Sequence, residues 1–295
     1  VDVSSMDADQ INEAVKNYKI FGRVRPEQKK DIVLALKKDG KKVAMTGDGV
    51  NDILAMKEAD CSIAMGAGSD AAMQAAQVVL LDSDFSHMQE IIGEGRRDIN
   101  NITRSATLFL YKNMFSMLLA LFSIWNAFSY PLQPSQVSLV SAFNIGIPAF
   151  LLALEPNEKK QNHRFLRVVL LRALPAGLTS FLSIAAMVVF GQMFDIPASD
   201  IGVTSTFLLS VVGFLILNRL CYPMNGYRRF VFVGCLIGEI LCAYFFSELF
   251  AISYISSACL MLCAVIAFAD ESLMRNLTMM VDRWLHREPK KQEES

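Results

Sequence analysis

The chain has 295 residues, 53% of them hydrophobic and 19% charged, and its mean hydropathy is +0.35. This composition is too apolar for an ordinary soluble protein and predicts that part of the chain lies in a lipid bilayer. The formal net charge of −1 argues against nucleic acid as a partner, because it provides no basic surface for binding it.

The first 85 residues alternate between helix and strand patterns. Such alternation predicts a parallel α/β sheet, which binds ligands beyond the carboxyl ends of its strands. Ser5 or Asp7 is a candidate cap for the first helix, while Pro26 and Gly40 mark the start and end of the second. We predict strands at 20–24, 41–46, 61–66 and 78–81, and helices at 4–18, 25–40, 51–59 and 69–77.

A long helix follows at residues 86–109, polar at its start and apolar at its end, and we interpret 86–105 as a stalk that enters a membrane. Six apolar runs come next, each near the ~20 residues that span a bilayer. They lie at about 106–129, 136–154, 168–193, 202–221, 229–247 and 250–269. The predicted domains are therefore 1–85 (α/β), 86–105 (stalk), 106–270 (all-α bundle of six transmembrane helices) and 271–295 (tail).

The charges of the connecting loops predict the orientation. Alternate loops have acidic residues only, at Asp195, Asp200 and Glu248. The other loops and the tail are basic, with Lys159, Lys160, Arg164, Arg167, Arg228, Arg229, Arg275, Arg283, Arg287, Lys290 and Lys291. By the positive-inside rule, the first unit and the tail are cytoplasmic, and the protein is a multi-pass protein of the plasma membrane.

The motif "TGDGVND" at residues 46–52 carries the predicted chemistry. The side chains of Asp48, Asn51 and Asp52 offer hard oxygen ligands that suit Mg²⁺ beside a phosphate. Gly47 and Gly49 let the backbone turn tightly near an anion, with Thr46 before them. A plain Asp-Gly hairpin is the alternative, but the residues after Gly49 have a helical pattern rather than a strand pattern.

"TGDGVND", preceded by "RVRPEQK" at 23–29, resembles the phosphorylation domain of P-type cation-transporting ATPases, which has a haloacid-dehalogenase-like, Rossmann-type fold. The resemblance is close over residues 20–105. It implies that Asp48 binds Mg²⁺, that Asn51 and Asp52 complete the acidic loop with Asp52 as a further candidate ligand, and that Lys29 holds the phosphoryl oxygens. It also implies ATP as substrate.

The resemblance is partial. The family's phosphorylated aspartate lies in an Asp-Lys-Thr-Gly-Thr motif, which this sequence does not contain. The chain also starts at Val1 without a methionine, so we expect a carboxyl-terminal fragment. The actuator domain and the nucleotide-binding domain, which holds most of the ATP, would then lie upstream in the full-length protein. The fragment alone is expected to be inactive.

Two alternatives stay open. "VVLLDSDF" has the form of a haloacid-dehalogenase nucleophile motif, which would make Asp82 the nucleophile of a membrane-anchored phosphatase. Its position after the acidic loop argues against this, because the nucleophile strand comes first in that fold. The second alternative is a truncated copy that serves as a non-catalytic membrane partner.

The apolar runs contain candidates for a transport site. The second run has Gly146 and Pro148 near its middle, where a proline loosens the helix and frees carbonyls. This run resembles the discontinuous sixth helix of calcium-type pumps, but neutral residues replace the carboxylates, so the cargo is Ca²⁺ or another cation, with polyamines and lipids as further options. The candidates are Asn113, Ser116, Ser141, Asn144, Pro148 and Glu239.

Overall fold

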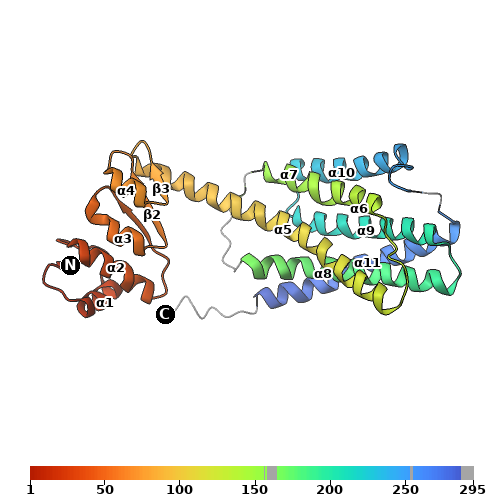
Figure 1. Ribbon diagram of the computed structural model, residues 1–295, viewed down its shortest axis with the longest axis horizontal. Coiled ribbons are helices and arrows are strands. Elements are labelled where there is room, and N and C mark those ends of the chain that lie inside the picture. Colours follow the sequence, from red (N-terminus) through yellow and green to blue (C-terminus); the bar gives the residue numbers. More distant parts are fainter. Residues whose placement is uncertain (156, 158–164, 253–254, 287–295) are drawn as a thin grey trace. The chain divides into compact units, whose positions relative to one another are not determined.

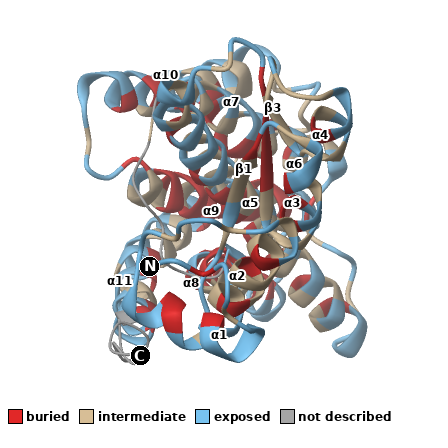
Figure 2. Ribbon diagram, turned by 90° about the vertical axis from the view of Figure 1, so that its left-hand side faces the viewer, coloured by how far each residue is buried: buried red, intermediate tan, exposed pale blue. Residues whose placement is uncertain are grey.

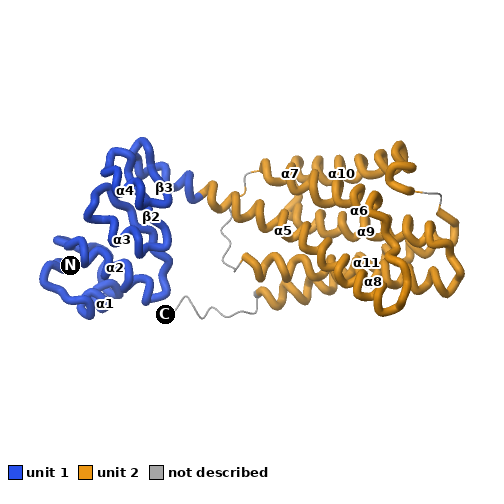
Figure 3. The backbone as a smooth tube through the Cα atoms, viewed as in Figure 1, with its two compact units in different colours: residues 1–92 blue, residues 93–295 orange. Residues whose placement is uncertain are grey.

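The computed structural model describes residues 1–155, 157, 165–252 and 255–286. The chain divides into two compact units, Val1–Ile92 and Gly93–Ser295, which are coloured separately in Figure 3. The boundary falls within helix α5 (Met88–Trp125), the helix predicted as stalk and first span. Because the two units are not placed relative to one another, each is described by itself.

Unit 1 contains the predicted parallel sheet (Figure 1). Its strands lie in the order β1 (Ala44–Gly47), β2 (Cys61–Met65) and β3 (Val78–Leu80), and both pairings are parallel. The carboxyl ends of all three therefore meet at one edge of the sheet. Segment η1 (Val50–Asp52), α3 (Ile53–Glu58) and α4 (Asp70–Ala75) connect the strands. The predicted α/β organisation of this unit is confirmed.

Two longer helices precede the sheet. Helix α1 (Ala8–Asn17) is preceded by Asp7, whose carboxylate accepts a 2.8 Å hydrogen bond from the Gln10 backbone N–H. Asp7 rather than Ser5 is therefore the cap. Helix α2 (Pro26–Lys38) has Pro26 in its first turn and is followed by Gly40 at φ +77°. Apolar side chains of the two helices pack together, with Ile11 and Ala35 among the buried residues.

The predicted strand at 20–24 is wrong. Gly22 forms one isolated parallel bridge with Asp2, through backbone bonds to Val1 and Val3. The next residue, Arg23, has a φ of +55°, which turns the chain away and ends the pairing. Two extended segments therefore touch at one point and do not continue as strands.

Unit 2 is helical. After α5 come α6 (Pro134–Ser141), the π-helical segment η3 (Ala142–Gly146), α7 (Ile147–Ala153), α8 (Phe165–Met193), α9 (Ala198–Leu220), α10 (Gly226–Phe245) and α11 (Ser257–His286). In the described part of the chain, five helical segments are long and apolar enough to span a bilayer: α5, the continuous run Pro134–Ala153, α8, α9 and α11. Five of the six predicted spans thus meet this criterion.

The remaining predicted span, 229–247, corresponds to α10. This helix has 20 residues, enough to cross a bilayer, but it carries the three charged side chains Arg228, Arg229 and Glu239. The two arginines lie in its first turn, where long side chains can reach the polar interface. Glu239 is the charged group in the body of the helix.

The last predicted span, 250–269, is wrong at its start. The segment Ala251–Ile252 is non-helical, Ala251 has a φ of +51°, and α11 begins only at Ser257. Ser256 precedes the helix and its hydroxyl accepts a hydrogen bond from the Cys259 backbone, as a cap does. Helix α11 continues to His286, well into the predicted tail. The predicted basic residues Lys159, Lys160 and Arg164, and all residues from Arg287, lie outside the described part.

The core of unit 2 forms where α8, α9 and α11 pack against each other, and α10 packs on the α6–α7 run (Figure 1). Helix α9 is the most buried of the candidate spans and appears largely red in Figure 2. On α5, Tyr111, Phe115 and Leu119 recur every four residues and are fully buried. The face of α5 that carries these residues is packed against protein, while much of the rest of α5 is exposed in this chain.

A polar contact joins the end of α7 to the start of α10. Glu155 Oε2 accepts a 2.6 Å bond from Arg228 Nε, and its Oε1 accepts a 2.5 Å bond from Asn225 Nδ2. Burial opposes ionisation of this carboxyl, yet the bonds from Arg228 and Asn225 hold the pKa of Glu155 below its ordinary value of 4.5. The folded state therefore favours the ionised form.

This contact predicts a pH dependence. A carboxyl whose pKa is lowered by folding contributes stability above its unfolded pKa and loses it as the pH falls through the lower folded value. We expect acidification below about pH 4.5 to lower the unfolding temperature of the wild type more than that of Glu155→Gln. Thermal unfolding at a series of pH values, followed by intrinsic fluorescence, measures this difference. Parallel curves for the two proteins would contradict the prediction.

Candidate functional site

The motif of residues 46–52, here called the acidic loop, begins in β1 and ends in η1. It therefore lies at the edge where the three parallel strands end. Gly47 is buried, and a Cβ atom at this position would lie 2.4 Å from the Asp52 Cβ. Only glycine fits there, and the close approach brings the start and end of the loop together.

Lys29 and Asp52 form an ion pair at the end of the acidic loop. Lys29 lies at the end of the first turn of α2, and its Nζ donates to Asp52 Oδ1 at 2.6 Å. The side chain of Asp52 is only 9% exposed, whereas that of Lys29 is 35% exposed. The charge-assisted bond offsets the cost of burying the Asp52 carboxylate and fixes the lysine ammonium at the loop.

The other two polar side chains of the loop are open to solvent. Asp48 and Asn51 are exposed, and within the described ranges no hydrogen bond or ion pair engages either side chain. No group of three or more His, Cys, Asp or Glu residues able to hold a metal is found among the described residues. A site with few protein ligands still suits Mg²⁺, because this ion commonly takes one or two carboxylates together with waters and phosphate oxygens. Asp48 and Asn51 therefore fit Mg²⁺ as part of its coordination shell.

A second loop, residues 66–69 after β2, braces the acidic loop. The Ser69 backbone N–H donates to the Asp48 carbonyl oxygen at 2.7 Å. A Cβ on Gly68 would lie 2.5 Å from that same oxygen. Sequence reasoning missed this contact, although the Gly-x-Gly pattern directly after a strand was an available signal. The backbone of Asp48 is held from the neighbouring strand's loop while its side chain stays free.

The Lys29–Asp52 pair predicts a local stability effect. Lys29→Met leaves the buried Asp52 carboxylate without its partner, which should lower the free energy of opening of the acidic loop by about 1–3 kcal/mol. Lys30→Met is the matched control, because it removes an exposed 3.3 Å pair with Glu58 that is worth about 0–1 kcal/mol. Hydrogen exchange of the loop amides measures the free energy of opening of the acidic loop in both variants. Equal effects of the two substitutions would show that the Lys29 pair has no special role.

Asp82 lies in the turn after β3, at the same edge of the sheet but two strands away from Asp48. Two strand spacings correspond to about 10 Å. Its carboxylate is exposed and pairs with His87 Nε2 at 2.8 Å. Asp82 therefore occupies a different position from the acidic loop and is engaged with a residue of the following turn.

In unit 2, Asn144 and Glu239 come together. Asn144 lies in η3 and donates from Nδ2 to Glu239 Oε2 on α10 at 2.8 Å, and both side chains are buried. Ser210 on α9 lines the same cavity as Glu239. The Asn144 Oδ1 atom is buried without a partner among the described residues. The amide nitrogen of one predicted candidate and a carboxylate oxygen of another thus meet within a helical bundle of mostly apolar residues.

The other transport candidates do not join this pair. Asn113 is exposed, Ser116 Oγ lies 3.2 Å from the Tyr130 hydroxyl, and Ser141 donates to the Val137 carbonyl in its own helix. Pro148 is buried in α7. The irregular backbone before it is the wide π-helical turn of η3 rather than an unwound segment, and it carries Asn144.

Sequence reasoning missed a second buried carboxylate. Asp270 on α11 is 2% exposed, and its Oδ1 contacts the hydroxyl of Ser183 on α8, which also lies 2.8 Å from the Thr179 carbonyl. A signal was present, because Asp270 follows a long apolar stretch and an ionisable group there is functional by default. It was overlooked because the predicted span stopped at residue 269.

Comparisons with known proteins give one family model and several consistent relatives. Residues 5–60 match the family model described as haloacid dehalogenase-like hydrolase. "Probable cation-transporting ATPase exp7" of Streptococcus pneumoniae is 40% identical over 253 residues, which are 83% of this chain and 32% of that protein. "Calcium-transporting ATPase CtpE" of Mycolicibacterium smegmatis is 45% identical over 180 residues, 58% of this chain and 23% of that protein.

A third relative matches a shorter part of the chain. "P-type sodium-transporting ATPase4" of Toxoplasma gondii is 39% identical over 151 residues, which are 51% of this chain and 11% of that protein. The chain thus spans about a third or less of the length of these relatives. All three are named as cation-transporting ATPases; the second is named for calcium and the third for sodium.

Proposed function

This chain is related to the P-type cation-transporting ATPases, and on that premise we propose that it forms the carboxyl-terminal part of such a pump. The full-length protein would hydrolyse ATP through an aspartyl-phosphate intermediate and move a cation across a membrane. The phosphorylated aspartate, the actuator domain and the nucleotide-binding domain would come from upstream segments. The observation that carries this proposal is that one short loop contains both the exposed Asp48 side chain and Asp52, which is paired with Lys29.

The roles proposed for the acidic loop follow from charge. Phosphoryl transfer develops negative charge on the phosphoryl oxygens, and a fixed positive group nearby lowers the barrier. Asp52 would hold the Lys29 ammonium in place, and Lys29 would offset that charge. Asp48, with Asn51 beside it, would hold Mg²⁺, which neutralises phosphate charge when bound. Thr46, Gly47 and Gly49 would place the backbone close to the phosphate.

The proposed transport site centres on Asn144 and Glu239. A buried carboxylate, an amide oxygen without a partner among the described residues, and the hydroxyl of Ser210, which lines the same cavity as Glu239, offer the oxygen atoms that hard cations prefer. One carboxylate gives the site less charge than a typical Ca²⁺ site, so Ca²⁺ is one candidate among several cations. Asn113, exposed here, and Ser116 and Ser141 would contribute only together with helices outside this chain.

The proposed location is the plasma membrane, with unit 1 and the end of α11 on the cytoplasmic side. The support is the distribution of loop charges, in which the described turns with Asp195, Asp200 and Glu248 have no Lys or Arg. ATP, the proposed substrate, is available on that side.

Cation-stimulated ATP hydrolysis by the full-length protein in proteoliposomes tests the proposed function. We expect Mg²⁺-dependent hydrolysis that rises when the transported cation is added, with Ca²⁺, Mn²⁺, K⁺ and a polyamine tried in turn. The cation that stimulates identifies the cargo. Hydrolysis that no cation changes would contradict transport, and absence of hydrolysis under every condition would favour the non-catalytic membrane partner.

A further inference from the structure

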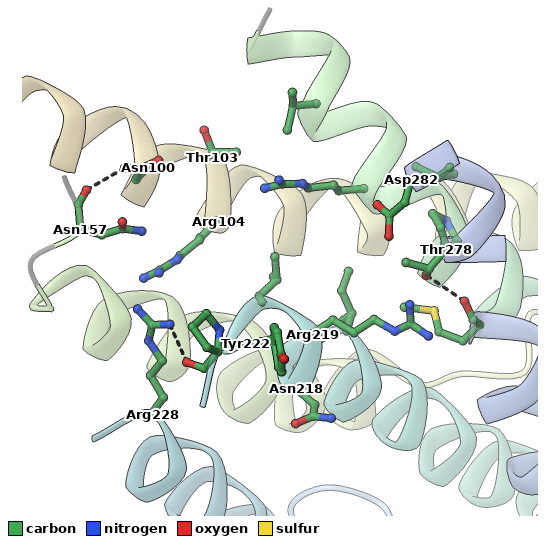
Figure 4. A pocket seen from close by; sticks show the side chains of 18 residues that line it. Asn100, Thr103, Arg104, Asn157, Asn218, Arg219, Tyr222, Arg228, Thr278 and Asp282 are labelled. Carbon is green, nitrogen blue, oxygen red and sulfur yellow. Dashed lines mark hydrogen bonds between the residues drawn. The ribbon is translucent and has the colours of Figure 1, made fainter. Parts of the chain in front are cut away.

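A cavity of about 720 Å³ lies in unit 2, apart from the Asn144–Glu239 pair. Its walls come from the early part of α5, the first half of α8, the end of α9, the segment leading into α10, and the end of α11 (Figure 4). These positions place it at the end of the helix bundle where α9 and α11 end and α8 and α10 begin. The cavity is therefore near one membrane interface.

Four arginines from four different helices line this cavity. They are Arg104 on α5, Arg172 on α8, Arg219 on α9 and Arg228 on α10, and the one carboxylate among the described lining residues is Asp282 on α11. Figure 4 shows Arg104 and Arg228 on one side of the cavity and Arg219 and Asp282 on the other. We call this the arginine cavity. The excess of positive side chains sets it apart from the apolar surroundings.

Two of the arginines are partly neutralised by the protein. Arg228 donates to Glu155 at 2.6 Å and to the Pro223 carbonyl at 2.9 Å, and it is 9% exposed. Arg104 lies 4.0 Å from the same Glu155 carboxylate and within electrostatic reach of Arg172 and Arg228. One carboxylate thus serves two guanidinium groups, which leaves positive charge on this side of the cavity.

The other two arginines have no hydrogen bond or ion pair within the described ranges. Arg172 is exposed to the open cavity, and Arg219 is half-buried, with Asp282 and Glu271 within electrostatic reach. A guanidinium group presents a planar fork of N–H donors that matches phosphate oxygens in pairs. Arg172 and Arg219 are therefore available to bind an anion.

Apolar side chains form the remaining wall of the cavity. Val168, Pro175, Ile216, Met274 and Val281 line it beside the arginines. A ligand that matches both the arginines and the apolar wall has an anionic head and an apolar body. Basic pockets between transmembrane helices near an interface are suited to the headgroups of anionic lipids.

From this arrangement we propose that the arginine cavity binds a phosphate-bearing anion, with the headgroup of an anionic phospholipid as its source. The phosphate lies between Arg172 and Arg219, and the acyl chains follow the apolar wall towards the bilayer. The binding requires neither ATP nor the transported cation, so it is separate from the proposed transport function.

Native mass spectrometry of the full-length protein in detergent tests this proposal, with phosphatidylglycerol, phosphatidylcholine and inorganic phosphate added separately. The double variant Arg172→Gln/Arg219→Gln removes the two available guanidinium groups. The double variant Arg229→Gln/Arg283→Gln is the matched control, because it removes two exposed positive charges near the same end of the bundle but outside the cavity lining. The double variant Arg172→Lys/Arg219→Lys keeps both positive charges and removes the planar N–H donors of the guanidinium groups.

We expect phosphatidylglycerol to bind the wild type and the control alike, and to bind the Gln double variant at least about tenfold more weakly. The Lys variant should fall between them, and phosphatidylcholine should bind weakly to all. If inorganic phosphate binds with the same arginine dependence and the lipid does not, the phosphate site stands and its source is soluble. Equal weakening in the cavity and control variants, or no arginine-dependent binding of either anion, would overturn the proposal.

Discussion

Asp48→Asn should lower ATP hydrolysis by the full-length protein on the order of a hundred- to a thousandfold. The substitution replaces an open carboxylate by a neutral amide of the same shape. The Ser69 bond to the Asp48 backbone and the Lys29–Asp52 pair are both kept, because neither uses the Asp48 side chain. Since the side chain is exposed, we expect the stability to change by no more than about 0.5 kcal/mol.

Asp9→Asn is the control for this prediction. It makes the same chemical change on an exposed position of α1, outside the acidic loop. A phosphate-release assay under saturating Mg²⁺ and ATP compares the two variants with the wild type. Hydrolysis by Asp48→Asn at a rate close to that of Asp9→Asn would remove Asp48 from the catalytic site.

Glu239→Gln should weaken cation transport on the order of ten- to a hundredfold, because the site loses its one proposed carboxylate. The buried Glu239 side chain accepts a hydrogen bond from Asn144, and glutamine keeps an acceptor oxygen for this bond. The helix packing should therefore persist while the negative charge is lost. We expect the effect mainly in the cation concentration needed for half-maximal transport.

Glu248→Gln is the matched control, since Glu248 is an exposed residue in the turn after α10. Uptake of the transported cation into sealed vesicles is measured over a range of cation concentrations. If Glu239→Gln has the same half-maximal concentration and the same maximal rate as Glu248→Gln, the Asn144–Glu239 pair is a structural contact only.

Local signals in the sequence predicted much of unit 1. Asp7 caps α1, Pro26 begins α2, and Gly40 follows it, each by rules that act over a few residues. The strand before the acidic loop was predicted because a short apolar run leads into a glycine turn. The strand at 20–24 failed because a short apolar pattern cannot show that Arg23 turns the chain away.

Contacts between distant residues could not be predicted in this way. Lys29 and Asp52 are 23 residues apart, Asn144 and Glu239 are 95 apart, and Ser183 and Asp270 are 87 apart. Both members of the first two pairs were candidates, but the sequence alone does not show which candidates meet. Apolarity also misled the start of the last span, because the non-helical residues Ala251 and Ile252 are themselves apolar.

Labelling of the full-length protein with ATP carrying a radioactive γ-phosphate tests the proposed mechanism most directly. We predict a covalent label that hydroxylamine removes, as it does from acyl phosphates, that depends on the transported cation, and that maps to an aspartate outside this chain. The label should be strongly reduced in Asp48→Asn and retained in Asp9→Asn. ATP hydrolysis without any labelled protein, or a label that maps to Asp82, would contradict the proposed pump, and the second result would establish the membrane-anchored phosphatase instead.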